Sequence, residues 1–486
     1  MQIVWFKRDL RISDHAALAK AKGKVLLLYI IEPELWQQPD LSTRHYLFLK
    51  ECLNELSSSL SQKNLQLVIK VGNVVEVFSK LNQQSPINEI LSHQETWNDW
   101  TFQRDKQLKS WCSAHKIKWQ EFPQNAVVRG LKDRDLWAGA WQQYMFSETW
   151  QIPNITSINI ASDPMPSPAT LKLKQDSCQF RQVGGHIQAQ KVLADFLQVK
   201  SKSYSSKMSS PLTAFNSCSR LSVHLAFGCI SIREVVQKTT SRIIELKAHS
   251  SWRRSLTAFK SRLHWHCHFI QKLESEPSLE FINIHSAYNN LDAIANNDYL
   301  LAWQSGNTGY PMIDACMRAL IATGWINFRM RAMLISFASH HLGLPWRVTG
   351  LYLAKMFTDY EPGIHWSQIQ MQSGTTGINS IRIYNPIKQS IDHDPKAIFL
   401  RQWLPELKNM PDEYIHTPWV YPEALNGYPK PIIDEKIARK SAAKRLYEVR
   451  NSISYKQEAK QVYLKLGSRK RPNKESSQRE LPISQD

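Results

Sequence analysis

The chain divides into two parts with different periodicities, and this division limits its possible folds more than any other feature. Up to about residue 130, short runs rich in Val, Ile and Leu alternate with amphipathic helical runs. Such alternation predicts right-handed βαβ crossovers and a parallel sheet covered by helices. Residues 1–130 should therefore form an α/β domain with a Rossmann-like sheet. The expected strands are 2–6, 24–31, 65–72 and 86–94, and the expected helices are 44–62 and 99–115.

The rest of the chain is helical in character. Over 131–195 the pattern loosens into runs such as "SDPMPSPATLKLKQDSC", which are typical of an interdomain connection. Helical periodicity then dominates and predicts an all-helical domain over 196–465. Residues 466–486 are polar and charged, which predicts a disordered tail. A length of 486 residues is too long for one ordinary core and suggests two or three domains.

The charge balance restricts the partners. Lys and Arg number 61 against 42 Asp and Glu, which gives a formal charge of +19. This excess favours a polyanion, nucleic acid first and an anionic membrane surface second, with a basic protein lacking any such partner as the alternative. No uninterrupted apolar run is long enough for a membrane span, and the N-terminus does not resemble a secretory signal. A cytoplasmic monomer without membrane contact is expected.

The cysteines and histidines do not predict a metal centre. The seven cysteines are scattered and form no CxxC pair, which is typical of reduced thiols. His264 and His268 are four residues apart in a helical run and could share a face, as zinc ligands can. Because neither an acidic ligand nor a second cluster lies nearby, packed histidines are the alternative, and no metal is expected.

Three arginines interrupt an apolar helical pattern in "TGYPMIDACMRALIATGWINFRMRAM", at positions 318, 329 and 331. Arginine stays charged, so near a core it must find an anion or extend its head to solvent. Asp359 and Glu361, in a segment with Pro and Gly, could present carboxylates to Arg329 or Arg331, although a surface ion pair would explain the pattern equally well. A fourth motif, "SCSRLSVHLAFGCIS", fits either a plain helix N-cap or a phosphate-binding one.

Four segments resemble the photolyase/cryptochrome family of flavoproteins. They occur in the family's order and span nearly the whole chain: "VWFKRDLRISDHAAL" (4–18), "SRLSVHLAFGCIS" (219–231), "WQSGNTGYPMIDACMRALIATGWINFRMR" (303–331) and "RIYNPIKQSIDHDPKAIFLRQWLPEL" (382–407). The resemblance implies an N-terminal α/β domain that can hold an antenna chromophore. It also implies an all-helical domain that holds FAD in a folded, U-shaped form.

The resemblance also implies which residues bind the FAD. Arg331 matches an arginine that forms a salt bridge with an aspartate beside the isoalloxazine ring, and Asp359 matches that aspartate. A guanidinium there would favour an anionic reduced flavin. Cys218 stands where a threonine is common in the phosphate-binding loop. The full cofactor-binding set is Tyr204, Cys218, Ser219, Arg220, Leu221, Ser222, Arg331, Asp359, Glu361 and His365.

Two function classes remain open on the DNA-facing residues. Trp265 matches the tryptophan that stacks on the lesion in repair enzymes, but Arg262 replaces a glutamate and Phe328 replaces an asparagine. The chain is therefore either a light-driven photolyase for cyclobutane dimers or a related photoproduct, or a cryptochrome that keeps FAD without repair. The charge favours the photolyase, with DNA carrying UV photoproducts as partner. The implied DNA-binding set is Arg262, Trp265, Phe328, Arg329 and Gln389.

The route for photoreduction departs from the family pattern of three tryptophans. Only Trp346 is clearly retained, since the outermost position aligns near Ala293 and the innermost near Ser367 or Ile369. Trp366 is the expected substitute donor, followed by Trp346, with reduction through Trp325 or Tyr384 as the alternative. His365 falls near flavin N5, where an imidazole could change protonation near neutral pH. The expected catalytic set is Trp265, Trp346, His365 and Trp366.

The antenna is not identified by the sequence. Glu95 lies near the place where folate-binding members keep a carboxylate, and folate, deazaflavin, a second flavin or no antenna all remain open. Some relatives hold an iron–sulfur cluster through cysteines late in the helical domain. No cysteine follows Cys316 here, so no such cluster is expected.

Overall fold

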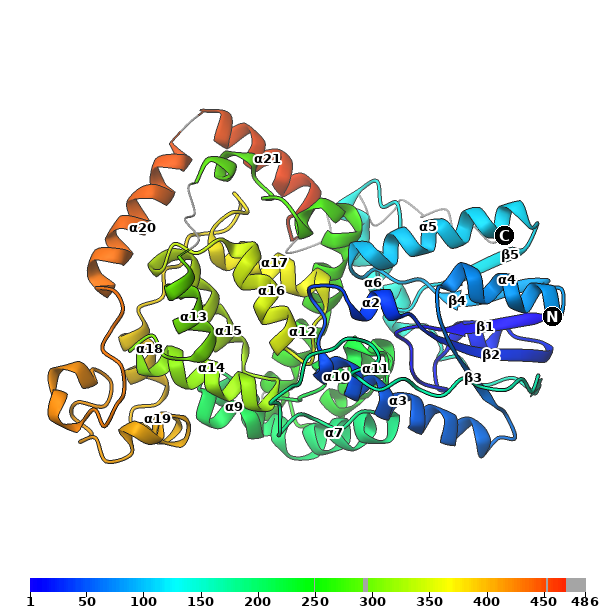
Figure 1. The fold of residues 1–486 in the computed structure, drawn as a ribbon, viewed down its shortest axis with the longest axis horizontal. Helices are drawn as coiled ribbons and strands as arrows, with labels where there is room; N and C mark the ends of the chain where they lie inside the picture. Colours follow the sequence, from blue (N-terminus) through cyan, green and yellow to red (C-terminus); the bar gives the residue numbers. More distant parts are fainter. Residues whose placement is uncertain (249, 292–295, 452, 469–486) are drawn as a thin grey trace.

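The computed structural model describes residues 1–248, 250–291, 296–451 and 453–468. Figure 1 shows a β-sheet with flanking helices at one end of the molecule and a larger body of helices at the other. The predicted combination of a parallel α/β part and a large helical part is confirmed. Among the described residues, no helix is both long and apolar enough to cross a bilayer.

All strand pairs are parallel, and the order is β3-β2-β1-β4-β5. The long strand β2 has two partners on one edge, because β3 pairs with its residues 27–31 and β6 with its residues 23–25. The sequence prediction missed β5, a largely half-buried edge strand, and the three-residue β6. The strands are β1 (Gln2–Phe6), β2 (Gly23–Ile31), β3 (Leu67–Val71), β4 (Glu89–His93), β5 (Lys118–Phe122) and β6 (Ile155–Ser157).

Alternate residues of the strands build two different cores, as the two-residue period of a strand requires. On β1, Ile3 and Trp5 pack in a cluster that includes residues of α4 and α5, whereas Val4 and Phe6 join a larger cluster. That larger cluster also contains residues of the helical part, so the core is continuous between the two parts. The helices up to residue 146 are α1 (Ala16–Ala19), α2 (Pro33–Trp36), α3 (Thr43–Ser61), α4 (Val74–Gln84), α5 (Asp99–Ala114) and α6 (Trp137–Phe146).

The segment expected to connect two domains, 131–195, contains α6, β6 and the first turns of α7. The domain boundaries themselves stay a prediction, and of the expected tail only residues up to 468 are described. The helices of residues 186–275 end with the long central α12. They are α7 (His186–Gln198), α8 (Tyr204–Lys207), α9 (Pro211–Ser217), α10 (Ser222–Ala226), α11 (Ile232–Glu245) and α12 (Ser251–Ser275). The later helices are α13 (Asn297–Ser305), α14 (Pro311–Thr323), α15 (Phe328–Ser336), α16 (Trp346–Met356), α17 (Pro362–Ser373), α18 (Pro386–His393), α19 (Ile398–Trp403), α20 (Glu435–Arg450) and α21 (Ile453–Leu466).

The backbone of the two parts meets closely at Gly228. Its φ is +64°, and a Cβ there would lie 2.1 Å from the carbonyl oxygen of Arg8. Leu10 N–H donates to Phe227 O at 3.3 Å beside it, and Arg11 Nη1 donates to Gly228 O at 3.0 Å. Only glycine fits this contact, which fixes the end of β1 against the loop after α10.

Candidate functional site

An ion pair between Arg331 and Asp359 joins α15 to the turn before α17. The Arg331 Nη1 and Nη2 atoms donate to Asp359 Oδ1 and Oδ2 at 3.0 and 2.8 Å, a bidentate geometry. Arg331 Nε also donates to Ile326 O at 2.8 Å, and the guanidinium lies 4.0 Å from the Phe357 ring centroid. The expected pair is therefore formed, with 4% of the Asp359 side chain and 22% of the Arg331 side chain exposed.

The charges around Asp359 keep its carboxyl ionised. Burial acts to raise its pKa, but Arg331, a hydrogen bond from Ser222 and the charge of Arg220 together lower that pKa below the ordinary value. Burial lowers the pKa of Arg220 to about 10, which still leaves it charged at neutral pH. Burial raises the pKa of the Cys218 thiol to about 12, within reach of the same arginine charges. The loop 218–222 and the ion pair thus form one charge cluster.

The side chain of Arg220 indicates that this cluster fits a ligand. Its backbone is left-handed, with φ +56°, and its guanidinium stacks 4.1 Å from the rings of both Phe215 and Trp325. Arg220 Nε donates to Gln182 Oε1 at 3.2 Å, whereas the buried Nη1 has no hydrogen-bond partner among the described residues. A buried donor left open costs about 1–3 kcal/mol. A phosphate or carbonyl oxygen of a large anionic cofactor would satisfy it.

Three further residues of the predicted cofactor set lie in three different surroundings: Ser219, Tyr204 and Glu361. Ser219 Oγ accepts from Leu221 N at 3.4 Å in the turn before α10. Tyr204 is buried edge-on against Phe196 and Phe259. Glu361 lines a cavity facing the α/β part, where burial raises its pKa to about 8, the charge of Arg8 lowers that pKa and the charge of Glu95 raises it. Its place in the cofactor-binding set stays a prediction.

His365 and Trp366 lie at the start of the second turn of α17 and are both buried. His365 Nε2 donates to Gly350 O at 2.9 Å, and burial lowers the pKa of its imidazole to about 3. The expectation that His365 changes protonation near neutral pH is therefore wrong, because an imidazolium at this place would lose its hydration. Trp366 lies edge-to-face with Trp346, with ring centroids 5.8 Å apart. The expected relay pair is in contact, while Ala293 lies outside the described residues.

The predicted DNA-facing residues fall on three helices. Arg262 is exposed on α12, and Trp265, one turn on, is partly buried against the Phe269 ring. Phe328 is 56% exposed at the start of α15, next to the partly buried Arg329. Gln389 lies on α18 and is partly buried. Two of the five, Arg262 and Phe328, are thus exposed, and the other three are partly buried.

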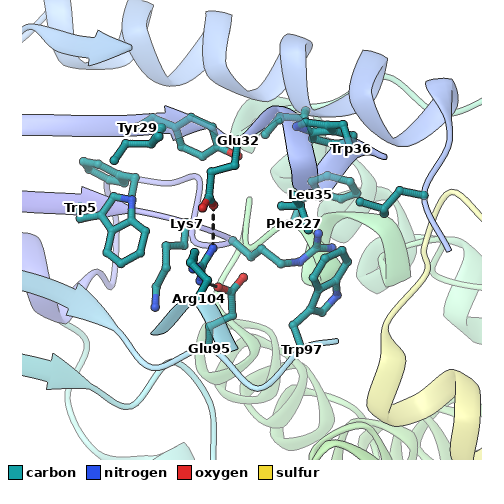
Figure 2. Close-up of a pocket in the computed structure, with 15 residues that line it drawn as sticks. Trp5, Lys7, Tyr29, Glu32, Leu35, Trp36, Glu95, Trp97, Arg104 and Phe227 are labelled. Atoms are coloured by element: carbon teal, nitrogen blue, oxygen red, sulfur yellow. Dashed lines mark hydrogen bonds and ion pairs between the residues drawn. The ribbon is translucent and has the colours of Figure 1, made fainter. Parts of the chain in front are cut away.

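A second cavity lies at the carboxyl ends of β1 and β2, and of its residues the sequence reasoning had singled out only Glu95. Figure 2 shows aromatic rings around a buried cation, Arg104, whose Nη1 donates to Glu32 Oε2 at 2.8 Å. The Arg8 guanidinium stacks 4.1 Å from the Trp97 ring centroid. The free space is about 30 Å³, room for water molecules. The labelled lining residues are Trp5, Lys7, Tyr29, Glu32, Leu35, Trp36, Glu95, Trp97, Arg104 and Phe227.

Several polar atoms that line this second cavity make no hydrogen bond to the described residues. Glu32 Oε1, Arg8 Nη2 and Trp97 Nε1 are buried without a hydrogen-bond partner among the described residues. Burial raises the pKa of Glu32 to about 7, even though Arg104 lowers it. Aromatic walls with a few convergent polar groups are typical of a site for a flat heteroaromatic ligand. Because such a ligand is larger than the free space, side chains that line the cavity would have to move to admit it.

Comparison with known proteins gives a consistent result for both parts. Residues 2–131 match the family model described as DNA photolyase, and residues 259–448 match that of the FAD binding domain of DNA photolyase. The chain is 28% identical to a deoxyribodipyrimidine photo-lyase of Salmonella typhimurium, over 90% of this chain and 96% of that protein. It is 29% identical to cryptochrome-2 of Arabidopsis thaliana, over 93% and 79%.

The fold agrees with these matches. A solved bacterial class III photolyase from Agrobacterium tumefaciens superimposes with a TM-score of 0.80 at 25% identity, covering 93% of this chain and 98% of that one. The similarity thus runs through both the sheet and the helical body, including the elements that carry the charge cluster at Arg331.

Proposed function

Because the chain belongs to the photolyase/cryptochrome family of flavoproteins, we propose that it is a DNA photolyase, a light-driven enzyme that repairs pyrimidine photoproducts. The observation that carries the proposal is the buried cluster of Arg331, Asp359 and Arg220, with the open N–H of Arg220. Two guanidinium groups and one carboxylate leave a net positive charge beside the rings of Phe215, Trp325 and Phe357. That environment suits an anionic FAD.

The chain's own residues would hold the cofactor and set its charge. Reduced FAD, when bound there, would absorb light and supply the electron that splits the lesion. Arg331 is fixed by Asp359 and by the Phe357 ring, so its positive potential is preorganised. Arg220, Ser219 and Ser222 would donate to phosphate or ring oxygens. His365 stays neutral and donates to Gly350, which leaves its Nδ1 free to accept a hydrogen bond.

The DNA side of the proposal rests on Trp265 and the charge. Repair of a base inside a duplex requires flipping, and the flipped bases need an aromatic face and a basic rim. Trp265 offers a partly exposed ring, and Arg262 adds an exposed cation one turn before it. A formal charge of +19 supports binding to the phosphate backbone. The lesion class and a cytoplasmic location are part of this proposal.

A cryptochrome, a photoreceptor without repair, is the second candidate. The specific observation in its favour is that Arg262 and Phe328, the two residues that depart from the repair pattern, are both exposed where DNA would meet the protein. The similarity to cryptochrome-2 is of the same order as that to the photo-lyases. Under this candidate the FAD site is kept and the lesion contacts are lost.

We also propose that the aromatic cavity of Figure 2 is the antenna site. Its open polar atoms at Glu32, Arg8 and Trp97 would bind the polar edge of a folate, deazaflavin or flavin ring. Purified protein would then carry a second chromophore, released on acid denaturation and identified by mass spectrometry. A preparation with FAD alone, after growth in medium that supplies these compounds, would count against an antenna here.

One experiment separates the two candidate functions. An oligonucleotide with a single cyclobutane dimer, or with a 6-4 photoproduct, is mixed with the reduced protein and kept dark or exposed to blue light. A photolyase restores the intact pyrimidines only in the light. Intact FAD photochemistry without restoration of either lesion would support the photoreceptor and refute repair.

A further inference from the structure

Tyr360, which no part of the proposed function uses, lies in a fully buried chain of hydrogen bonds next to Trp366. The Trp366 indole N–H donates to the Tyr360 oxygen at 3.2 Å, and the Tyr360 hydroxyl donates to Asp40 Oδ2 at 2.8 Å. Tyr360 is 2% exposed, and Trp366 is fully buried. The ring of Tyr360 also contacts His365 edge-on, with centroids 5.1 Å apart. An indole, a phenol and a carboxylate are thus connected in series.

Asp40 reaches this chain from the other part of the molecule, in the loop between α2 and α3. It is 3% exposed, and its Oδ2 also accepts from Asn98 Nδ2 at 3.1 Å, while Oδ1 has no partner among the described residues. Burial raises the pKa of this carboxyl despite both hydrogen bonds. A carboxyl of this kind is a better proton acceptor than an ordinary aspartate.

A proton taken up by Asp40 can be passed on through a neighbouring cleft. Asp40 lines a cleft of about 330 Å³ between the two parts of the chain, together with Asn98, Asp99 and Glu280. Burial raises the pKa of Glu280 to about 7, so this group can exchange protons near neutral pH. The Tyr360 phenol is buried away from water. Among the described residues, the Asp40 carboxylate is the acceptor of its hydroxyl proton.

We propose that Tyr360 is the terminal electron donor when light reduces the cofactor, and that Asp40 is the base that takes its proton. The inference rests on the proposed function, because oxidised FAD excited by light is the primary oxidant. One electron leaves Trp366 for the flavin and gives the indole radical cation. Tyr360 then returns one electron to Trp366 while its hydroxyl proton passes to Asp40. The products are neutral Trp366, a neutral tyrosyl radical, a protonated Asp40 and a flavin that holds the one extra electron and its negative charge, so electrons, protons and charge balance.

The same geometry explains why the electron would come from Tyr360 rather than from Trp346. A phenol gives up an electron readily only if its proton leaves in the same step, which requires a base within hydrogen-bond distance. Tyr360 has a carboxylate at 2.8 Å. The Trp346 indole N–H donates to Asn283 Oδ1 at 2.8 Å, and an amide oxygen is a very weak base. Asn283 therefore cannot take a proton from Trp346, whereas Asp40 can take one from Tyr360.

The test is the identity of the radical formed when FAD-loaded protein is illuminated without DNA. Electron paramagnetic resonance of freeze-trapped wild-type protein should show a tyrosyl radical, and Tyr360→Phe, which keeps the ring, should show a tryptophan radical instead. Asp40→Asn should also lose the tyrosyl radical, because an amide cannot take the proton. In D2O the tyrosyl signal should rise severalfold more slowly in the wild type. Tyr352→Phe is the matched control, since the Tyr352 hydroxyl donates to a backbone carbonyl, Gln304 O, at 2.6 Å.

A second readout needs no flavin. In flavin-free protein with ¹³C-labelled aspartate, the carboxyl resonance that disappears in Asp40→Asn should titrate above the ordinary aspartate range. A tryptophan radical in the wild type, or a tyrosyl radical that survives in Tyr360→Phe, would overturn the inference while leaving repair intact. Loss of repair with the tyrosyl signal present would instead refute the proposed function alone. The absence of any light-induced radical from FAD-loaded protein would also overturn the inference alone, because the repair assay starts from protein that is already reduced.

Discussion

Replacing Asp359 by alanine tests the ion pair on which the proposed FAD site depends. The change removes both oxygen acceptors of the Arg331 guanidinium and leaves that cation without its counter-charge. Breaking a buried pair from one side typically costs about 3–5 kcal/mol. Arg331 keeps its bond to Ile326 O, its contact with Phe357 and some exposure to water, so the expected loss lies at the lower end, about 3 kcal/mol.

Replacing the partner, Arg331, by alanine should change the unfolding free energy by an amount that depends on pH. In the wild type the folded pKa of Asp359 is lowered, so its contribution to stability is present above the ordinary aspartate pKa and disappears as the pH falls through the folded value. In Arg331→Ala the guanidinium is gone and burial raises that pKa, so the carboxyl takes up a proton as the pH falls. The difference in unfolding free energy between wild type and Arg331→Ala should therefore be larger at pH 8 than at pH 5.

Urea unfolding of the flavin-free proteins, followed by circular dichroism, measures these differences, and absorbance at 450 nm gives the flavin content of the purified chains. Asp392→Ala is the control, because the Lys388–Asp392 pair is a largely exposed i,i+4 pair that contributes only about 0.3–0.5 kcal/mol. If Asp359→Ala unfolded at the same urea concentration as Asp392→Ala and kept its FAD, the assignment of this pair would be wrong.

Three further predictions concern the photochemistry, the pH dependence and DNA. Trp366→Phe should slow photoreduction severely while FAD stays bound, and unchanged kinetics would direct attention to Trp325 or Tyr384. His365 has a folded pKa of about 3, so the unfolded chain binds a proton that the folded chain excludes, and the unfolding free energy should fall as the pH drops below about 6.5. His365→Asn should reduce that slope by up to about 1.4 kcal/mol per pH unit and should leave photoreduction between pH 6 and 8 without any new pH dependence. DNA affinity should decrease steeply with salt, and Trp265→Ala should cost about 1–3 kcal/mol for damaged over undamaged DNA; an equal loss on both DNAs would make Trp265 a packing residue.

Local patterns predicted the elements well and some of the site. The strands β1 to β4 and the helices α3 and α5 lie where alternation and amphipathicity placed them, because each pattern follows from the period of a single element. The Arg331–Asp359 pair was reached through the family resemblance, whereas the chemistry of the arginines alone left Arg329 and a surface pair open. The position of Glu361, two residues after Asp359 but turned toward Arg8, was not predicted, because a short turn decides which way each carboxylate points.

The sequence by itself determined the two-part architecture through local periodicity and the family through linear motifs, whereas the role of loop 218–222 in the cofactor site stays a prediction. Only the tertiary structure decided that His365 is neutral, because its pKa is set by burial rather than by neighbours in the chain. Only the tertiary structure also brought Asp40 to Tyr360 across 320 positions and joined Trp5, Arg104 and Phe227 around one cavity. Contacts between residues so far apart leave no periodic signal in the sequence, and they form only when the two parts pack on their common core.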